Sequence, residues 1–354
     1  METEGEMNWS FLIRVYTLLP VPVLLMGCGK SESAESDKSV VVYTSVDDVF
    51  ARPICEEFER ETGIKVLLVT DTEETKSTGL LNRLIAEKER SRADVFWSGD
   101  PVRAGVLKLK EVSTPYRSAA AKGLPANYSD PDGHWIGFSA RARVLIYNKT
   151  RLKSEKLKPP QSVSDLADPR FKGKACLANP LFGTTSMHAA ALFQVLGDKG
   201  ARKFFQSLVD NQVTIVSSNG EVRRLVAAGK FAIGLTDTDD AHVAIREGKP
   251  IGVVYPDRNG NGTLVVPNAV VLIKGGPHPD AARRFIDYLL RAETEMALAK
   301  SAAAQLPLRP DVTPPSDVTP IGDIKAMDVD YARLAEALQK LSRGFLKEWV
   351  DQNK

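Results

Sequence analysis

Trp135-Ile-Gly-Phe-Ser-Ala-Arg-Ala-Arg-Val-Leu-Ile-Tyr147 is an extended, mostly apolar segment near the middle of the chain. It is long enough to leave one domain and enter another, since most strands of globular proteins are shorter. A second segment of this kind is Gly262-Thr-Leu-Val-Val-Pro-Asn-Ala-Val-Val-Leu-Ile273. We therefore expect two lobes that share two extended crossings.

The chain before the first crossing alternates buried strands with amphipathic helices. The β-branched and apolar runs at 39–43, 64–69 and 93–97 are typical of strands buried on both faces. The helical spacing of apolar residues between these runs predicts helices at 50–62 and 80–85. Strand, helix, strand, helix, strand is the order of a parallel, doubly wound sheet.

The chain after the first crossing repeats this pattern. Strands are predicted at 174–177 and 213–216, and helices at 186–196, 201–209, 221–228, 279–300 and 332–349. The predicted fold class is α/β, with two doubly wound lobes joined by two extended crossings. We assign residues 39–140 and 268–320 to the first lobe, and residues 141–267 and 321–354 to the second.

The composition limits the classes of function. The chain has 354 residues and 43% hydrophobic residues, which is enough for two domains with sizeable cores. Its 47 Lys and Arg nearly balance its 45 Asp and Glu, so we expect no nucleic-acid partner. We expect a monomer.

The N-terminus indicates export. Arg14 precedes an uncharged run at 15–27 that is too short for a comfortable membrane span but suits a signal peptide. Leu25-Met-Gly-Cys28 resembles the bacterial lipobox, which implies that residues 1–27 are removed and Cys28 is lipidated. Residues 28–38 then form a polar tether to the membrane surface. Met1 and Met7 both remain candidate starts.

An acidic turn follows the apolar run that begins at Phe231. Asp237, Asp239 and Asp240 fall within four residues, where a predicted strand gives way to a helix. One aspartate is enough to cap a helix, because its carboxylate accepts backbone N–H bonds and suits the helix dipole. Three aspartates instead indicate a cation or a hydrogen-bonding ligand opposite them.

Two further acidic groups directly follow predicted strands, Asp47 with Asp48 and Asp100. Ligands of doubly wound sheets lie beyond the carboxyl ends of the strands, so these groups should converge on one cleft. Carboxylates without Cys or His ligands favour Fe³⁺, Ca²⁺, Mg²⁺ or Mn²⁺ over copper and zinc. The candidate metal ligands are Asp47, Asp100, Asp239 and Asp240. Asp48 is better explained as a helix cap.

Several motifs, taken in order, resemble one family. They are Val-Val-Val-Tyr43-Thr-Ser, Phe58-Glu-Arg-Glu-Thr-Gly-Ile-Lys-Val66, Ala93-Asp-Val-Phe-Trp-Ser98, Ser139-Ala-Arg-Ala-Arg-Val-Leu-Ile-Tyr-Asn148, Ala227-Ala-Gly-Lys-Phe-Ala-Ile-Gly234 and Ala281-Ala-Arg-Arg-Phe-Ile-Asp-Tyr-Leu289. Together they resemble the type 2 periplasmic binding proteins of ABC importers, in the ferric-iron-binding branch. This resemblance implies a Venus-flytrap fold that closes by bending at the crossings. It also implies delivery of a small ligand to an ABC permease and its ATPase, in the periplasm or on the outer face of the cytoplasmic membrane.

The resemblance carries over to individual positions. The family's iron-binding His falls on Asp47, its Glu falls on Gly99 beside Asp100, and its tyrosine pair falls on Asp239 and Asp240. None of the expected iron ligands is retained. The family's anion-binding Arg falls on Arg141 and matches, and the small-residue turn that also holds the anion falls near Gly183-Thr-Thr-Ser186.

Two kinds of ligand therefore remain open. One is a hard metal cation, ferric or divalent, with or without a synergistic anion. The other is a phosphate or phosphonate, such as an aminoalkylphosphonate, held by arginine and hydroxyl groups with the Asp pair on its ammonium. The predicted ligand-binding residues are Thr44, Ser45, Asp47, Ser98, Asp100, Arg141, Gly183, Thr184, Thr185, Asp237, Asp239 and Asp240, with Ser186 as a further candidate for the oxyanion.

The sequence does not favour an enzyme. It lacks Gly-x-Ser-x-Gly, Ser-x-x-Lys with its partners and His-x-x-x-His, so a surface-anchored hydrolase is disfavoured and no catalytic residue is predicted. Cys55 and Cys176 lack metal-binding spacing and are expected to be free, buried thiols.

Overall fold

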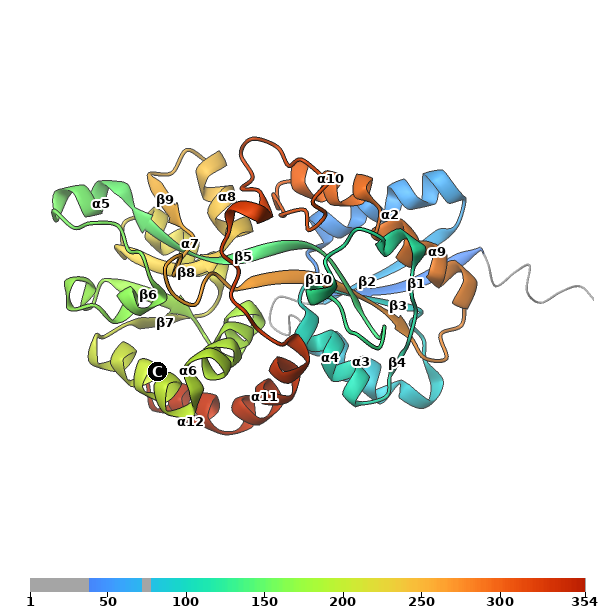
Figure 1. The fold of residues 1–354 in the computed structure, drawn as a ribbon, viewed down its shortest axis with the longest axis horizontal. Coiled ribbons are helices and arrows are strands. Elements are labelled where there is room, and N and C mark those ends of the chain that lie inside the picture. Colours follow the sequence, from blue (N-terminus) through green and yellow to red (C-terminus); the bar gives the residue numbers. More distant parts are fainter. Residues whose placement is uncertain (1–37, 72–77, 354) are drawn as a thin grey trace, which may run out of the picture.

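The computed structural model describes residues 38–71 and 78–353. Figure 1 shows two lobes side by side, joined through the middle by the long strands β5 (Ile136–Asn148) and β10 (Val265–Ile273). The predicted fold class is confirmed. The predicted signal peptide, the predicted lipidation site Cys28 and nearly all of the predicted tether lie outside the described residues.

The first lobe is built on a mostly parallel sheet. Strands β1 (Ser39–Thr44), β2 (Lys65–Thr70) and β3 (Val95–Ser98) run parallel in the order β2-β1-β3, and β10 joins β3 in the antiparallel sense. The short strand β4 (Ser113–Thr114) pairs with β10. Helices α2 (Asp48–Thr62), α3 (Gly79–Ala86) and α4 (Pro101–Leu109) connect these strands, as the alternating pattern predicts.

The second lobe repeats the arrangement on the other half of β5. The strand order is β5-β8-β6-β7, with β6 (Ala175–Ala178) parallel to both β7 (Thr214–Val216) and β8 (Ile233–Asp237), and β9 (Ile251–Val254) pairs with β5. The connecting helices are α5 (Lys149–Ser154), α6 (Gly183–Asp210), α7 (Asn219–Ala227) and α8 (Thr238–Arg246).

The two crossings pass each other at an irregular point. The β5–β10 register shifts between Pro267 and Asn268, and Ser139 opposite has a positive φ of 35°. The buried Glu295 carboxylate accepts hydrogen bonds from three backbone N–H groups here, those of Ser139 (2.6 Å), Leu308 (2.9 Å) and Arg309 (3.0 Å). A buried carboxylate is stabilised by such bonds, so this point is firmly held despite its strained backbone.

Helix α11 (Tyr331–Arg343), near the C-terminus, lies against both α4 and α6 and so contacts both lobes (Figure 1). A Cβ at Gly105 of α4 would lie 2.8 Å from the Ala335 side chain, so the helices approach closely only because residue 105 is glycine. The residue ranges predicted for the two lobes, 39–140 with 268–320 and 141–267 with 321–354, remain a prediction.

Helix boundaries differ from the expected ones at two places. The helix predicted at 279–300 is two helices, α9 (Pro279–Leu289) and α10 (Ala292–Lys300). The last helix is also two, α11 and α12 (Phe345–Gln352), because the backbone at Gly344 leaves the helical region. The helices predicted at 186–196 and 201–209 both lie in the span of α6, and the backbone leaves the helical region between them at Gly197 (φ 69°, ψ 168°), as the gap in the prediction implies. No helix in the described part of the chain is long and apolar enough to cross a membrane.

Candidate solute-binding site

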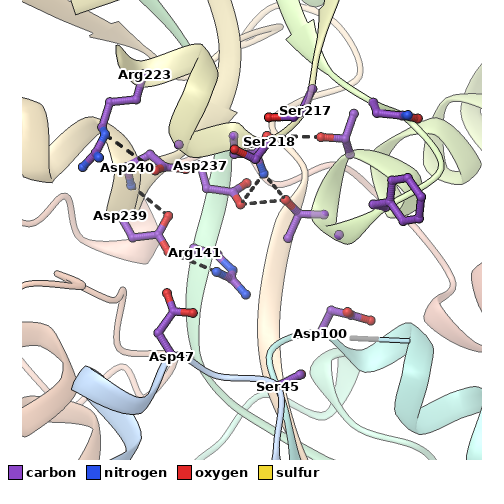
Figure 2. A pocket seen from close by; sticks show the side chains of 18 of the residues that line it. Ser45, Asp47, Asp100, Arg141, Ser217, Ser218, Arg223, Asp237, Asp239 and Asp240 are labelled. Carbon is purple, nitrogen blue, oxygen red and sulfur yellow. Dashed lines mark hydrogen bonds and ion pairs between the residues drawn. The ribbon is translucent and has the colours of Figure 1, made fainter. Parts of the chain in front are cut away.

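A cavity of about 390 Å³ lies where the carboxyl ends of the strands in the two lobes face each other (Figure 2). Its walls come from the turns after β1, β3, β6, β7 and β8 and from the middle of β5. Ten of the twelve predicted ligand-binding residues line it: Ser45, Asp47, Asp100, Arg141, Gly183, Thr184, Thr185, Asp237, Asp239 and Asp240. The expectation that the acidic groups converge on one cleft thus agrees with the structure.

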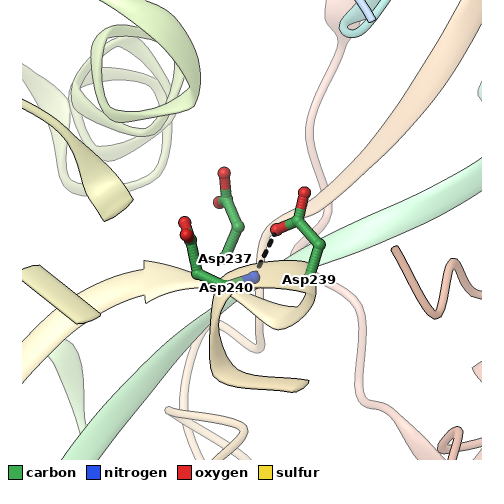
Figure 3. Close-up of side chains that lie close together, drawn as sticks. All are labelled: Asp237, Asp239 and Asp240. Atoms are coloured by element: carbon green, nitrogen blue, oxygen red, sulfur yellow. Dashed lines mark hydrogen bonds between the residues drawn. The ribbon is translucent and has the colours of Figure 1, made fainter. Parts of the chain in front are cut away.

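The three aspartates at the start of α8 form the densest acidic group in this cavity (Figure 3). One carboxylate oxygen from each of Asp237, Asp239 and Asp240 lies within 4.8 Å of the others. The pKa of Asp240 is raised to about 7 by burial and by the nearby Asp239 and Asp237 carboxylates. Burial and Asp237 also raise the pKa of Asp239, against the opposing effect of Arg141. A cation would relieve this repulsion.

Arg141 lies at the centre of the cavity and contacts both lobes (Figure 2). Its Nη1 donates to Asp239 Oδ2 at 3.0 Å, and its Nη2 donates to the Gly99 carbonyl oxygen at 2.9 Å. Burial lowers its pKa, but the charges of Asp239, Asp237 and Asp47 outweigh burial, so the net shift is upward and the guanidinium stays charged. A Cβ at position 99 would lie 2.7 Å from Nη2, so glycine admits the guanidinium there.

Arg143 is an important residue that the sequence argument missed. Its side chain is fully buried, and Nη1 donates to Asp237 Oδ1 at 2.7 Å. The Arg143–Asp237 and Arg141–Asp239 pairs thus join arginines two residues apart on β5 to aspartates two residues apart at the β8–α8 turn. Alternating side chains on a strand share a face, so the Arg-Ala-Arg spacing could have revealed it.

The two acidic groups of the first lobe differ in burial. The Asp100 side chain accepts the Arg103 N–H at 3.1 Å as the cap of α4, and its carboxylate pairs with the Arg103 guanidinium at 3.3 Å. It is therefore already neutralised within the protein. Asp47 is only partly buried and points toward Arg141 (Figure 2). Asp48, by contrast, is not at the cap position but is the first residue of α2, and it pairs with Arg52 on the surface.

Thr44 and Ser98 do not reach the cavity, contrary to the prediction. Thr44 is fully buried and its hydroxyl donates to the Trp97 carbonyl oxygen at 2.9 Å, which fastens β1 to β3. The fully buried Ser98 hydroxyl accepts the Asp100 N–H at 3.3 Å. Ser186 is also fully buried outside the cavity lining, and its hydroxyl donates to the Gly183 carbonyl oxygen. Asp237 occupies the cap position of α8 without a side-chain cap bond, since its carboxylate is bound by Arg143 instead.

The turn between β7 and α7 supplies lining residues that the sequence argument did not select. Ser218 caps α7 by accepting the Glu221 N–H at 3.1 Å, and Arg223 Nε lies 3.9 Å from Asp240 Oδ1. A serine after a predicted strand is a recognisable helix start, so this turn could have been placed beside the others. The additional lining residues are Phe50, Ala178, Asn179, Phe182, Ser217, Ser218, Asn219, Gly220, Arg223 and Val243.

Comparison with known proteins identifies the family. The family model described as bacterial extracellular solute-binding protein matches residues 91–333. The chain belongs to this family. The role predicted from the sequence, a binding protein rather than an enzyme, is confirmed by this membership and by relatives that are named as binding and uptake proteins.

Curated relatives match most of this solute-binding protein. Iron uptake protein A1 of Synechocystis sp. is 29% identical, over 91% of this chain and 92% of the relative. The major ferric iron-binding protein of Neisseria meningitidis serogroup B is 25% identical, over 84% and 89%. A putative 2-aminoethylphosphonate-binding periplasmic protein of Salmonella typhi is 26% identical, over 73% of each chain.

Solved structures share the two-lobed fold. The ferric binding protein from Campylobacter jejuni has a TM-score of 0.77 at 22% identity, covering 88% of this chain and 99% of the other. The Trichodesmium protein in complex with iron and citrate ligands has a TM-score of 0.75 at 25% identity, covering 89% and 99%. The predicted resemblance to the ferric-iron-binding branch of type 2 binding proteins agrees with these matches.

Proposed function

We propose that this protein is the substrate-binding component of an ABC importer and that its solute is ferric iron, bound together with an oxyanion. The observation that carries the proposal is the acidic turn in the cavity wall, where carboxylate oxygens of Asp237, Asp239 and Asp240 lie within 4.8 Å of one another and Asp239 and Asp240 would bind the metal. Hard oxygen ligands of this kind suit Fe³⁺ and also Ca²⁺, Mg²⁺ and Mn²⁺. The iron named in the relatives' descriptions favours Fe³⁺ among these.

The charges around the cavity favour an anion beside the metal. Asp237 and Asp239 already pair with Arg143 and Arg141, so these carboxylates do not present two full negative charges to a bare cation. An oxyanion that bound Arg141 would release Asp239 for the metal. The first turns of α6 and α7 also border the cavity, and helix N-termini favour anions. The volume of about 390 Å³ greatly exceeds the ~30 Å³ share of one water molecule, so both groups fit.

A second candidate is an aminoalkylphosphonate. Arg141 and the Gly183–Thr185 turn would bind the phosphonate, and Asp239 with Asp240 would bind the ammonium group. The Salmonella typhi relative named for 2-aminoethylphosphonate gives this candidate its support. Iron remains the first candidate because the carboxylate group is crowded enough to raise the pKa of Asp240 to about 7, and a metal neutralises such a group more fully than one ammonium does.

The remaining part of the proposal concerns location and partners. The mature chain would be held at the membrane through a lipid on Cys28 and would pass its solute, as a monomer, to a permease and its ATPase. The lipobox-like Leu25-Met-Gly-Cys28 supports the anchor. Cys28→Ala should move the protein from the membrane fraction to the soluble fraction. Unchanged membrane association of this variant would refute lipidation.

Calorimetric titration of the metal-free protein tests the proposed solute. Ferric iron supplied with citrate should bind one to one and more tightly than Ca²⁺, Mg²⁺ or Mn²⁺, and Asp239→Asn should weaken it. Tight binding of 2-aminoethylphosphonate, abolished by Asp239→Asn and accompanied by no iron binding, would replace the first candidate with the second.

A further inference from the structure

Arg143 forms hydrogen bonds to four side chains in the wall of the solute cavity, yet it does not line the cavity itself. Its Nη1 donates to Thr184 Oγ1 (3.0 Å), Asn219 Oδ1 (3.1 Å) and Asp237 Oδ1 (2.7 Å), and its Nη2 donates to Thr185 Oγ1 (3.2 Å). All four partners line the cavity. The guanidinium therefore supports the wall from behind.

These four partners come from three separate turns of the second lobe. Thr184 and Thr185 belong to the first turn of α6, Asn219 begins α7, and Asp237 ends β8. The partners also bond to one another: Thr184 Oγ1 donates to Asp237 Oδ2 at 2.6 Å, and Asn219 Nδ2 donates to the same oxygen at 3.1 Å. Because a guanidinium presents its donors in a fixed plane, one side chain sets the spacing of all three turns.

The two arginine–aspartate pairs differ in burial. In the Arg143–Asp237 pair the side chains are 0% and 4% exposed, whereas in the Arg141–Asp239 pair they are 21% and 15% exposed. Both oxygens of Asp237 are occupied by protein donors. A solute can exchange with the exposed pair, but separating the buried pair would leave a charge without a partner away from water.

We propose that Arg143 is a positioning residue of the solute site: it fixes the α6, α7 and β8 turns relative to one another and withholds Asp237 from the solute. Asp239 and Asp240 are then the carboxylates of this turn that meet the solute. This inference rests on the proposed function for its binding readout, although its structural part does not depend on the identity of the solute.

Substitutions at Arg143 and Asp237 separate positioning from simple stabilisation. Arg143→Lys keeps a charge for Asp237 but cannot reach the threonines and Asn219 together. The double variant Arg143→Met with Asp237→Asn removes both buried charges, so it avoids the penalty of an unpaired one. Arg309→Met is the matched control, because Arg309 is also a buried arginine but bonds backbone carbonyl groups of the first lobe, away from the cavity.

Two measurements are made on each variant, hydrogen exchange without solute and calorimetric titration with ferric iron and citrate. Arg143→Lys and the double variant should exchange faster at 183–186 and 217–220 and bind iron about 10- to 100-fold more weakly, as for other groups that orient metal ligands. Arg309→Met should have a lower Tm with unchanged iron affinity.

Binding within twofold of the unmodified protein by the double variant, with unchanged exchange in both segments, would overturn the positioning role. Failure of the unmodified protein to bind iron would instead refute the proposed solute, and the hydrogen-exchange result would still decide whether Arg143 fixes the turns.

Discussion

Arg141 and Asp239 form an ion pair, 3.0 Å from Nη1 to Oδ2, whose arginine is also bonded to the opposite lobe through the Gly99 carbonyl oxygen. The guanidinium thus connects the acidic turn of the second lobe to the turn after β3 in the first lobe. The arginine matched to the family's anion-binding position is therefore already engaged before any anion arrives.

Arg141→Lys should weaken binding of ferric iron with citrate by about tenfold or more. Lysine keeps the positive charge but is a single point donor, so it cannot bond Gly99, Asp239 and an anion in one plane. Titration of both proteins measures the effect. Arg52→Lys, at a surface pair with Asp48, is the control and should bind as the unmodified protein does. Equal affinities for both variants would show that Arg141 does not contact the solute.

Asp47 and Asp48, adjacent in the first lobe, allow a matched test of which carboxylate contributes to iron binding. Asp47 lines the cavity, whereas Asp48 pairs with Arg52 on the surface and does not line it. Asp47→Asn should lower iron affinity by about tenfold, because an amide oxygen is a weaker ligand for a hard cation than a carboxylate. Asp48→Asn, which removes the same charge one residue away, should leave the affinity within about twofold. A similar loss in both variants would mean that only net charge matters.

The raised pKa of Asp240, about 7 against an ordinary value of 3.8, predicts a pH dependence of stability. Between about pH 4 and pH 7 the folded protein holds this proton while the unfolded chain has lost it. The folded state then binds more protons, so this group's contribution to the free energy of unfolding falls as pH rises through that window. Denaturant unfolding of the metal-free protein at several pH values measures this, and Asp240→Asn should flatten the decline.

The same proton should be released when a cation binds. At pH 6, titration of iron with citrate in buffers of different ionisation enthalpy should give heats that depend on the buffer, and Asp240→Asn should reduce that dependence. Heats that change equally with buffer in both proteins would exclude Asp240 as the source.

The strained crossing at Ser139 predicts a stabilising substitution. Ser139 has φ of 35°, and its buried hydroxyl has no hydrogen-bond partner among the described residues. Ser139→Gly removes both penalties and should raise the free energy of unfolding by about 1 kcal/mol. Ser207→Gly, inside helix α6, should lower it by about 1 kcal/mol. Chemical denaturation measures both changes, and a destabilised Ser139→Gly protein would show that this conformation costs little.

Local pattern was sufficient to predict the layered architecture. The run at 135–147 predicted the crossing strand β5, because a strand buried over nearly its whole length lacks a helical period. The three acidic turns were placed together because each follows a strand, and the carboxyl ends of strands in such sheets lie on one edge. The break at Gly344 was missed because an isolated glycine within a helical pattern does not by itself end a helix.

The partners and directions of some polar side chains depend on pairing between strands, which local sequence patterns did not predict. Arg143 lies opposite Asp237 in the antiparallel β5–β8 register, which no single segment encodes. Thr44 was predicted to contact an oxyanion through its hydroxyl, but this hydroxyl turns to the neighbouring strand β3. The position of a polar residue at a strand end therefore predicted the right edge of the sheet but not the direction of its side chain.

Anomalous diffraction at the iron edge from crystals of the iron-loaded protein tests the central claim most directly. The account predicts one iron peak in the cavity, with oxygen ligands from Asp47, Asp239 and Asp240 and an anion between the metal and Arg141. Asp237 should still be bonded to Arg143. A cavity without an iron peak, or iron bound only at surface carboxylates, would contradict the proposal that this protein is an iron-binding component of an importer.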